Sequence, residues 1–229
     1  MATFGLVHGA WHGAWCWERL ILELHSAGHR AVAMDLPCDD ATATFHEYAG
    51  VVIAALDGEA GDVVLVGHSL AGHTIPLVAA LRPVARLVFL CALVPEPQRS
   101  SSELAARDNM ILSHYKRGLN PPDGQGRRAW ADENVAHSVL YGDCDDAVAH
   151  AAYERLRPQS SAPYGVPCPL NALPGVPRTS IICTDDRILD NAWSRRAARH
   201  LDADLIELPG SHSPFLSRPR DLAAVLLSF

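Results

Sequence analysis

Short apolar segments alternate along this chain with longer segments in which apolar residues recur at helical spacing. The apolar segments predict strands at residues 2–8, 30–34, 62–67, 86–91, 178–183 and 203–208. Helical spacing predicts helices at residues 15–27, 44–58, 70–81, 190–200 and 218–228, with Asp190 or Asn191 and Ser217 as expected caps. This alternation is typical of a mostly parallel six-stranded sheet with helices on both faces.

The alternation stops between residues 95 and 177, where Pro and Gly are frequent and helical spacing is confined to residues 101–115 and 145–157. Because this segment is short and irregular, we expect one domain over residues 1–229. Its core would be about residues 1–94 and 178–229, and residues 95–177 would form a cap insertion of small helices. Ligands of open α/β sheets bind outside the carboxyl ends of the strands, so the cap is expected to lie over the site.

Residues 63–72 carry the strongest chemical signal in the chain. An apolar strand runs into a Gly-x-Ser-x-Ala sequence that begins at Gly67 and places Ser69 on a sharp turn before a helix. Such a turn exposes the hydroxyl, and the helix N-terminus points its amides at the reacting group. A glycine-rich turn with a capping serine is the plainer alternative. We interpret Ser69 as a nucleophile.

A serine hydroxyl needs a base to take its proton, and the base needs a group that orients it. His212 lies in a Gly-Ser-His-Ser-Pro loop after the last predicted strand, and Asp185 and Asp186 follow the strand at 178–183. The order Ser, Asp, His is the one expected on an α/β-hydrolase sheet. Spacing alone leaves the two aspartates equal, and the other one is expected to cap the next turn.

Acyl transfer also needs donors for an oxyanion. The amide of Leu70, directly after the nucleophile, and that of Ala10, in the Gly-rich loop after the first strand, are the expected pair. His8 and His12 in this loop are four residues apart, but no Glu or Cys nearby completes a metal site. We therefore expect no metal, and expect both rings to shape the loop through hydrogen bonds.

These motifs resemble those of the plant methylesterase and hydroxynitrile lyase branch of the α/β-hydrolases, together with its bacterial relatives. The resemblance covers most of the chain and rests mainly on residues 7–17, 64–70, 88–90, 156–158 and 182–187. It implies Asp186 as the acid and the amides of Ala10 and Leu70 as the oxyanion donors. It also implies ester hydrolysis, because the lyases have a hydroxyl residue in place of Gly9 and a lysine in place of Ser213.

Composition narrows the partners of such a site. Of the 229 residues, 48% are hydrophobic and 20% charged, and the net charge is -7 without a Lys/Arg-rich run, which argues against nucleic acid or a membrane as partner. The six cysteines include no Cys-x-x-Cys pair and are expected to be reduced and packed. The first strand begins within a few residues, so we expect no leader and a cytoplasmic protein. Exposed apolar residues of the cap would permit a homodimer.

We therefore expect a cofactor-free serine hydrolase that cleaves carboxylic esters of small, largely apolar molecules through an acyl-enzyme on Ser69. Hydroxynitrile lyase-like, lactone or cyclisation chemistry in the same site is one alternative, and a ligand-binding protein with little turnover is another. The side chains expected to line the substrate pocket are Trp11, His12, Trp15, Cys91, Tyr115, Trp130 and Tyr141.

Overall fold

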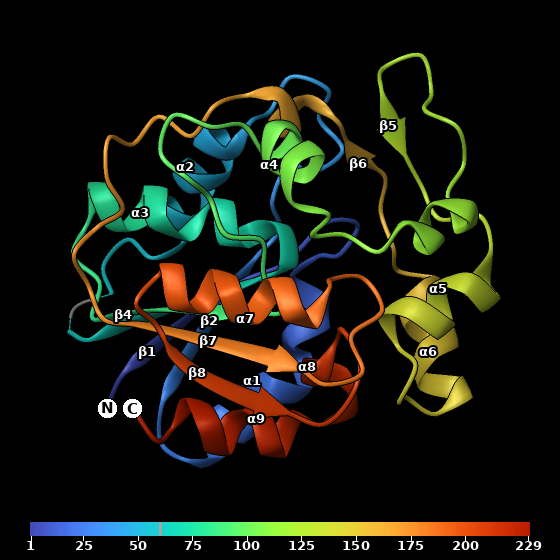
Figure 1. The fold of residues 1–229 in the computed structure, drawn as a ribbon. Helices are drawn as coiled ribbons and strands as arrows, with labels where there is room; N and C mark the ends of the chain where they lie inside the picture. The colour runs from blue at the N-terminus through green and yellow to red at the C-terminus, as the bar shows by residue number, and fades with distance from the viewer. Residues whose placement is uncertain (60) are drawn as a thin grey trace.

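The computed structural model describes residues 1–59 and 61–229, and a six-stranded parallel sheet forms its centre (Figure 1). In the order of the sheet, the strands are β2 (Arg30–Met34), β1 (Thr3–Val7), β3 (Val63–His68), β4 (Arg86–Leu90), β7 (Arg178–Cys183) and β8 (Asp204–Leu208). Every neighbouring pair is parallel. All six predicted strands are confirmed, with ends that differ by at most one residue.

The burial of each strand follows its place in the sheet. β3 lies between β1 and β4, and all of its residues are buried because helices cover both faces. β8 lies at an edge, and of its residues only Leu208 is buried. The apolar run before Ser69 is thus one of the two central strands of the sheet, which gives the following turn a rigid base.

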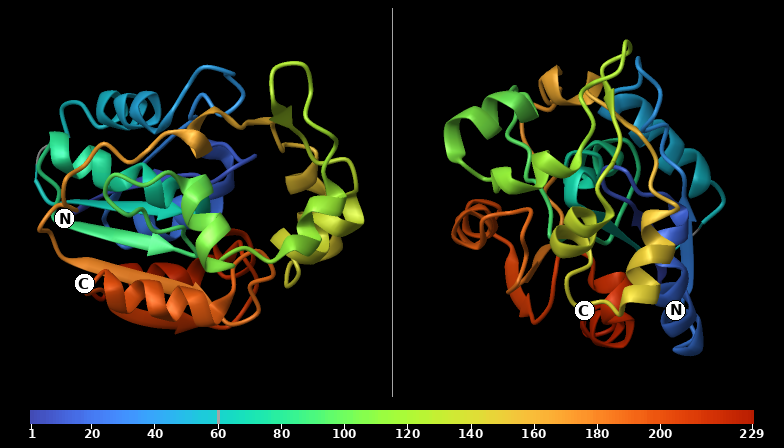
Figure 2. Two further views of the ribbon diagram at one scale, coloured as in Figure 1. Left: turned by 45° about the horizontal axis from the view of Figure 1, so that its top comes forward. Right: turned by 90° about the vertical axis from the view of Figure 1, so that its right-hand side faces the viewer.

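Helices cover both faces of the sheet (Figures 1 and 2). The helix α1 (Glu18–Ser26) and the helix α9 (Pro219–Leu226) pack together on one face, and on the other face lie α2 (Phe45–Ala55), α3 (Ile75–Leu81) and α7 (Asn191–His200). The 3-10 helix η1 (Ala14–Trp17) leads into α1. The five predicted helical segments are therefore confirmed.

The predicted helix caps have different outcomes. The Asp190 side chain accepts a hydrogen bond of 2.6 Å from the Trp193 amide and caps α7. The prediction of Ser217 as a cap is wrong, because Ser217 ends the short helix α8 (Pro214–Ser217) and Arg218 precedes α9. A proline starts each of these two helices, since its fixed backbone angle suits the first turn.

The segment between β4 and β7 has its own small elements. They are α4 (Ser101–Asp108), η3 (Ser113–Gly118), β5 (Arg127–Arg128), α5 (Glu133–Leu140), α6 (Asp146–Tyr153), β6 (Gln159–Ser160) and η4 (Ala162–Gly165). Much of this segment lies beyond the arrowheads of the sheet strands (Figure 2, left). Helices α4 and α6 lie in the predicted helical stretches, whereas α5 and the antiparallel pair β5 and β6 were not predicted.

The surface and the cysteines bear on two further expectations. Five cysteines are buried and Cys144 is half-buried, as predicted. Among the described residues, Val166 is the one exposed large apolar side chain within residues 95–177, and the homodimer stays a prediction. No helix in the described part of the chain has the length and apolar character needed to cross a membrane.

Candidate active site

Ser69 stands at the turn between β3 and the 3-10 helix η2 (Ser69–His73). Its φ of 51° lies in the left-handed region, which residues other than glycine rarely occupy. The turn also brings strand and helix close together, since a Cβ on Gly67 would lie 2.9 Å from Cγ2 of Ile75 and 3.0 Å from the Ala71 carbonyl oxygen. Ser69 is half-buried, so the strained turn leaves its hydroxyl within reach of other groups at the strand ends.

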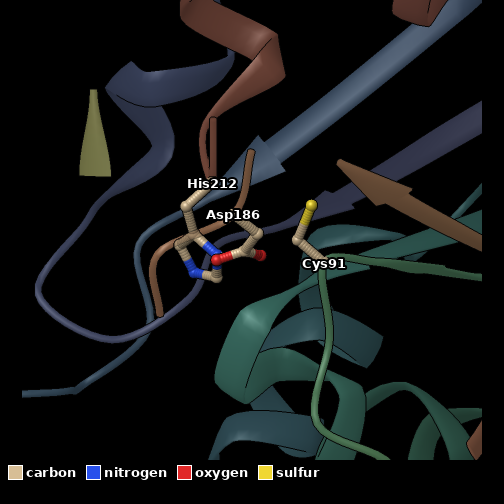
Figure 3. A group of neighbouring side chains, drawn as sticks. All are labelled: Cys91, Asp186 and His212. Carbon is tan, nitrogen blue, oxygen red and sulfur yellow. The ribbon is translucent and has the colours of Figure 1, made fainter. Parts of the chain in front are cut away.

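Ser69, His212 and Asp186 form one continuous chain of hydrogen bonds. Nε2 of His212 is 3.0 Å from Oγ of Ser69, and Nδ1 is 2.8 Å from Oδ2 of Asp186. A carboxylate accepts, so Nδ1 carries the ring proton and Nε2 can accept from the serine hydroxyl. Figure 3 shows the His212 ring against the Asp186 carboxylate. This geometry allows the imidazole to take a proton from Ser69.

Two further hydrogen bonds orient the Asp186 carboxylate. Its Oδ1 accepts from the amides of Ile188, at 2.7 Å, and Leu189, at 3.0 Å. The neighbouring Asp185 is exposed and instead accepts from the Gly210 amide at 3.2 Å. The structure therefore brings Asp186 to His212 and leaves Asp185 to connect the loops that follow β7 and β8.

In the loop after β1, three consecutive carbonyls, those of Gly9, Ala10 and Trp11, accept hydrogen bonds. Nδ1 of His8 lies 2.8 Å from the Gly9 oxygen, and Nδ1 of His12 lies 2.9 Å from the Ala10 oxygen. The amide of Arg157 donates to the Trp11 oxygen at 2.7 Å. The Gly9 carbonyl and the Ala10 amide belong to one peptide, so the bond from His8 fixes the direction in which that amide points.

The amides of Ala10 and Leu70 remain available as donors. Within residues 1–59 and 61–229, neither donates a hydrogen bond. Both residues are almost fully buried, at 6% and 3% exposure. A pair of buried amides beside a serine hydroxyl can stabilise a negative oxygen that forms there.

Both loop histidines are neutral. Burial lowers the pKa of His8 to about 4 and that of His12 to about 3. The bare Nε2 of His8 accepts from the Leu36 amide at 2.9 Å, and the bare Nε2 of His12 accepts from the Tyr141 hydroxyl at 2.9 Å. Both rings therefore shape the loop, as the sequence predicts.

Gly9 leaves no room for a side chain. A Cβ at this position would lie 2.8 Å from Cβ of Ser69 and 2.8 Å from Nδ1 of His68. Real Cβ atoms do not approach other heavy atoms this closely, so a larger residue would displace either the turn at Ser69 or the loop after β1. The close approach of the loop to Ser69 thus depends on glycine.

His68 is a site residue that the sequence analysis missed. Its Nε2 is 3.0 Å from the His212 carbonyl oxygen, and the centroids of the two rings are 4.7 Å apart. A carbonyl only accepts, so Nε2 of His68 is the donor, and burial keeps the pKa of the ring well below its usual value. The signal in the sequence was the position of His68 directly before Ser69. From this position the same turn places Ser69 and, through the His68 ring, holds the backbone of His212.

The expected pocket residues divide into separate groups. Trp11, Tyr115 and Trp130 form an aromatic cluster, with ring centroids of Trp11 5.6 Å from Trp130 and 6.1 Å from Tyr115. His12 and Tyr141 are joined by their hydrogen bond, and Trp15 stacks on the His12 ring at 5.5 Å. Cys91 is buried beside Asp186 and His212 (Figure 3).

A cavity of about 600 Å³ lies away from this site. Its walls are α4, α7 and residues 94–97, and none of Ser69, Asp186 and His212 is among its lining residues. The triad therefore does not open into this cavity, whereas the aromatic cluster includes Trp11, the residue directly after Ala10.

Comparison with known proteins identifies the family to which this arrangement belongs. The model of the alpha/beta hydrolase family matches residues 6–225. The chain belongs to the alpha/beta hydrolase family. Its sheet, its Ser, Asp, His order and its Gly-rich first loop are the features that the sequence analysis assigned to this family.

Relatives within the family include proteins named esterase, methylesterase and pyrethroid hydrolase, which support a carboxylesterase-like hydrolase. A pyrethroid hydrolase of Sphingobium wenxiniae is 28% identical over 98% of this chain and 86% of its own length. Salicylic acid-binding protein 2 of Nicotiana tabacum is 28% identical over 98% of this chain and 95% of its own length. The crystal structure of a pyrethroid hydrolase from Sphingobium faniae matches with a TM-score of 0.85 and 25% identity, covering 100% of this chain and 96% of that chain.

Proposed function

We propose that this hydrolase is a serine esterase that cleaves carboxylic esters of small, largely apolar molecules through an acyl-enzyme on Ser69. The observation that carries the proposal is the unbroken hydrogen-bond chain from Oγ of Ser69 through His212 to Asp186. The proposal takes residues 1–229 as one domain in which residues 95–177 cover the site. It places the protein in the cytoplasm, which the six free thiols support.

The reaction proceeds in two halves. Oγ of Ser69 attacks the acyl carbon while Nε2 of His212 takes the hydroxyl proton, and His212 then gives that proton to the leaving alcohol. In the second half, His212 takes a proton from water, which attacks the acyl-enzyme and releases the acid, and the proton returns to Ser69. Asp186 orients the imidazole and stabilises its charged form throughout.

The amides of Ala10 and Leu70 donate to the oxyanion in both halves. The Ala10 amide is pre-positioned, because the Gly9 and Ala10 carbonyls are bonded to neutral histidines and the Trp11 carbonyl to a backbone amide. Donors that do not reorganise during the reaction give the largest stabilisation of the developing charge.

The aromatic cluster of Trp11, Tyr115 and Trp130 supports the proposal that the substrate has an apolar acyl or alcohol group. Relatives named for a pyrethroid and for methyl jasmonate are consistent with this class. Hydroxynitrile lyase chemistry is disfavoured, because Gly9 has no hydroxyl and Ser213 cannot supply the positive charge of the lyase lysine. Ser213 is also fully buried, with its Oγ unpaired within the described residues.

The test is labelling by a fluorophosphonate probe, followed by mapping of the labelled peptide. We expect wild type and Ser138→Ala, a control at another half-buried serine, to be labelled on Ser69, and Ser69→Ala to remain unlabelled. Equal labelling of Ser69→Ala and wild type would contradict the proposal. Multiple-turnover hydrolysis of p-nitrophenyl acetate is expected, whereas cyanide release from mandelonitrile would indicate the lyase reaction, and a single burst would indicate a binding protein.

A further inference from the structure

We propose that Cys91, Asp186 and His212 form an inhibitory site for a thiophilic divalent cation such as Zn²⁺ or Cd²⁺. The inhibition rests on the function proposed above, but binding of the cation does not. The three residues follow β4, β7 and β8, so the carboxyl ends of adjacent strands bring them together.

The three side chains are close enough to share one ion. Sγ of Cys91, a carboxylate oxygen of Asp186 and a ring nitrogen of His212 all lie within 4.8 Å of one another. Figure 3 shows the side chains converging from separate segments. Metal–ligand bonds of about 2.0 to 2.3 Å at tetrahedral angles place ligand atoms roughly 3.5 Å apart. At the upper limit of 4.8 Å, Sγ of Cys91 would move about 1 Å toward the other two ligand atoms, while Nδ1 of His212 and Oδ2 of Asp186, now 2.8 Å apart, would separate slightly. Side-chain rotation can supply both shifts.

The donor set suits zinc-like ions better than magnesium or calcium. Thiolate sulfur, imidazole nitrogen and carboxylate oxygen are all zinc ligands, whereas Mg²⁺ and Ca²⁺ prefer oxygen alone. Cys91 is the decisive member, because without it the site would be the ordinary pair of an aspartate and a histidine. Its φ of 43° is unusual for a residue other than glycine, and its side chain is 1% exposed.

Binding requires a proton to leave Cys91. The neighbouring Cys183 and burial hold the pKa of the Cys91 thiol well above its usual value, so the free protein carries the thiol form. The exchange is a cation plus Cys91 thiol giving a metal thiolate plus one released proton. Ligation through Nδ1 moves the ring proton to Nε2, which then cannot accept the proton of Ser69, and ligation through Nε2 occupies the base itself. Either mode therefore stops the reaction.

The binding test uses metal-free protein titrated with Cd²⁺, followed by calorimetry and by the ultraviolet charge-transfer band of cadmium thiolate. We expect wild type and Cys144→Ala, the control at the half-buried thiol, to bind alike with the band present. Cys91→Ala should bind at least about tenfold more weakly and lose the band, since removal of even an outer partner costs that much. Cys91→Ser, which keeps a small polar side chain, replaces Cys91→Ala if that variant fails to fold.

Activity is measured in parallel, each variant against its own metal-free rate. Cd²⁺ should stop turnover of wild type and Cys144→Ala over the range in which it binds, with recovery after EDTA, while Cys91→Ala resists. No band in wild type, or equal binding by Cys91→Ala, would overturn the proposal. A chain that never hydrolyses esters refutes the proposed function instead, and the cadmium band still decides whether the site exists.

Discussion

The two sides of the active site are held by different parts of the molecule. On the nucleophile side, Ser69, His212 and Asp186 follow strands of one sheet and bond to one another directly. On the oxyanion side, the Ala10 loop is bonded partly by residues of the cap segment 95–177, among them Tyr141. The three side chains of the nucleophile side thus bond to one another without a cap residue between them, and the cap bonds only their neighbours, such as Ser211 and Ile188. On the oxyanion side the cap bonds the loop itself.

The cap contacts the Ala10 loop most directly at Trp11. Its carbonyl accepts from the Arg157 amide at 2.7 Å, and its indole Nε1 donates to the Arg128 carbonyl at 3.0 Å. The cap therefore contacts the Ala10 loop directly and the Ser69–His212 pair only through neighbouring residues such as Ser211. We expect substitutions on the two sides to differ in the size of their effect and in their dependence on the cap.

The largest effect is expected on the nucleophile side, from Asp186→Asn. An amide in place of the carboxylate reverses the hydrogen bond to Nδ1 and favours the wrong tautomer of His212, which lowers kcat by about 10³ to 10⁴. The measurement is steady-state ester hydrolysis, with KM expected to change little. Asp185→Asn is the matched control and should retain kcat within about threefold, because its exposed side chain only joins two loops. Equal losses in the two variants would contradict the assignment of Asp186.

The same division explains how much the sequence could predict. The strands are apolar, β-branched runs between small turn residues, and β3 with its adjoining Gly67–Ser69 turn carries both a structural and a chemical signal. In the cap, β5 is two residues long and is formed by Arg127 and Arg128, so neither hydropathy nor propensity marks it. α5 had a signal, because Asp132 caps it and Val135, Ala136, Val139 and Leu140 recur at helical spacing.

The site residues follow the same rule. Ser69, Asp186 and His212 could be predicted because each lies within a few residues of the end of a strand, although spacing alone did not separate Asp186 from Asp185. The hydrogen bonds of His68 and Arg157 could not be predicted, because each joins segments that are far apart in sequence. His68 bonds to His212, and the Arg157 amide bonds to Trp11. Such contacts depend on where the loops meet in space, and a local pattern does not encode that.

The free energy of unfolding should depend on pH through the oxyanion side, where His8 and His12 must remain uncharged. Burial lowers their pKa values to about 4 and about 3, from an ordinary 6.5 in the unfolded chain. Below pH 6.5 the unfolded chain binds protons that the folded protein does not, so stability falls as the pH falls. Between pH 6.5 and pH 5 the loss is roughly 2 kcal/mol for each ring.

Urea unfolding at pH 7, 6 and 5 measures this loss. His12→Gln should reduce the pH dependence by the share of one ring, because His8, His68 and His73 remain buried with lowered pKa values. His114→Gln, which removes an exposed ring, should leave the pH dependence of wild type intact. Stability that stays constant from pH 6.5 to pH 5 would show that the two rings are not held neutral.

The smallest effect is expected from Tyr141→Phe, which tests the link between cap and oxyanion loop. The change removes the hydroxyl that donates to Nε2 of His12 at 2.9 Å and leaves a buried acceptor without a partner. His12 then holds the Ala10 carbonyl less firmly, so kcat should fall by about tenfold with KM nearly unchanged, since the loss is in the transition state.

Tyr153→Phe, at a half-buried tyrosine of α6 in the same cap, is the control and should leave kcat unchanged. A rise in KM for Tyr141→Phe at constant kcat would indicate instead that Tyr141 lines the substrate pocket, as the sequence alone suggested. An unchanged kcat and KM would show that the cap does not act on the oxyanion loop through His12, and the contacts of Trp11 with Arg128 and Arg157 would be its remaining link to that loop.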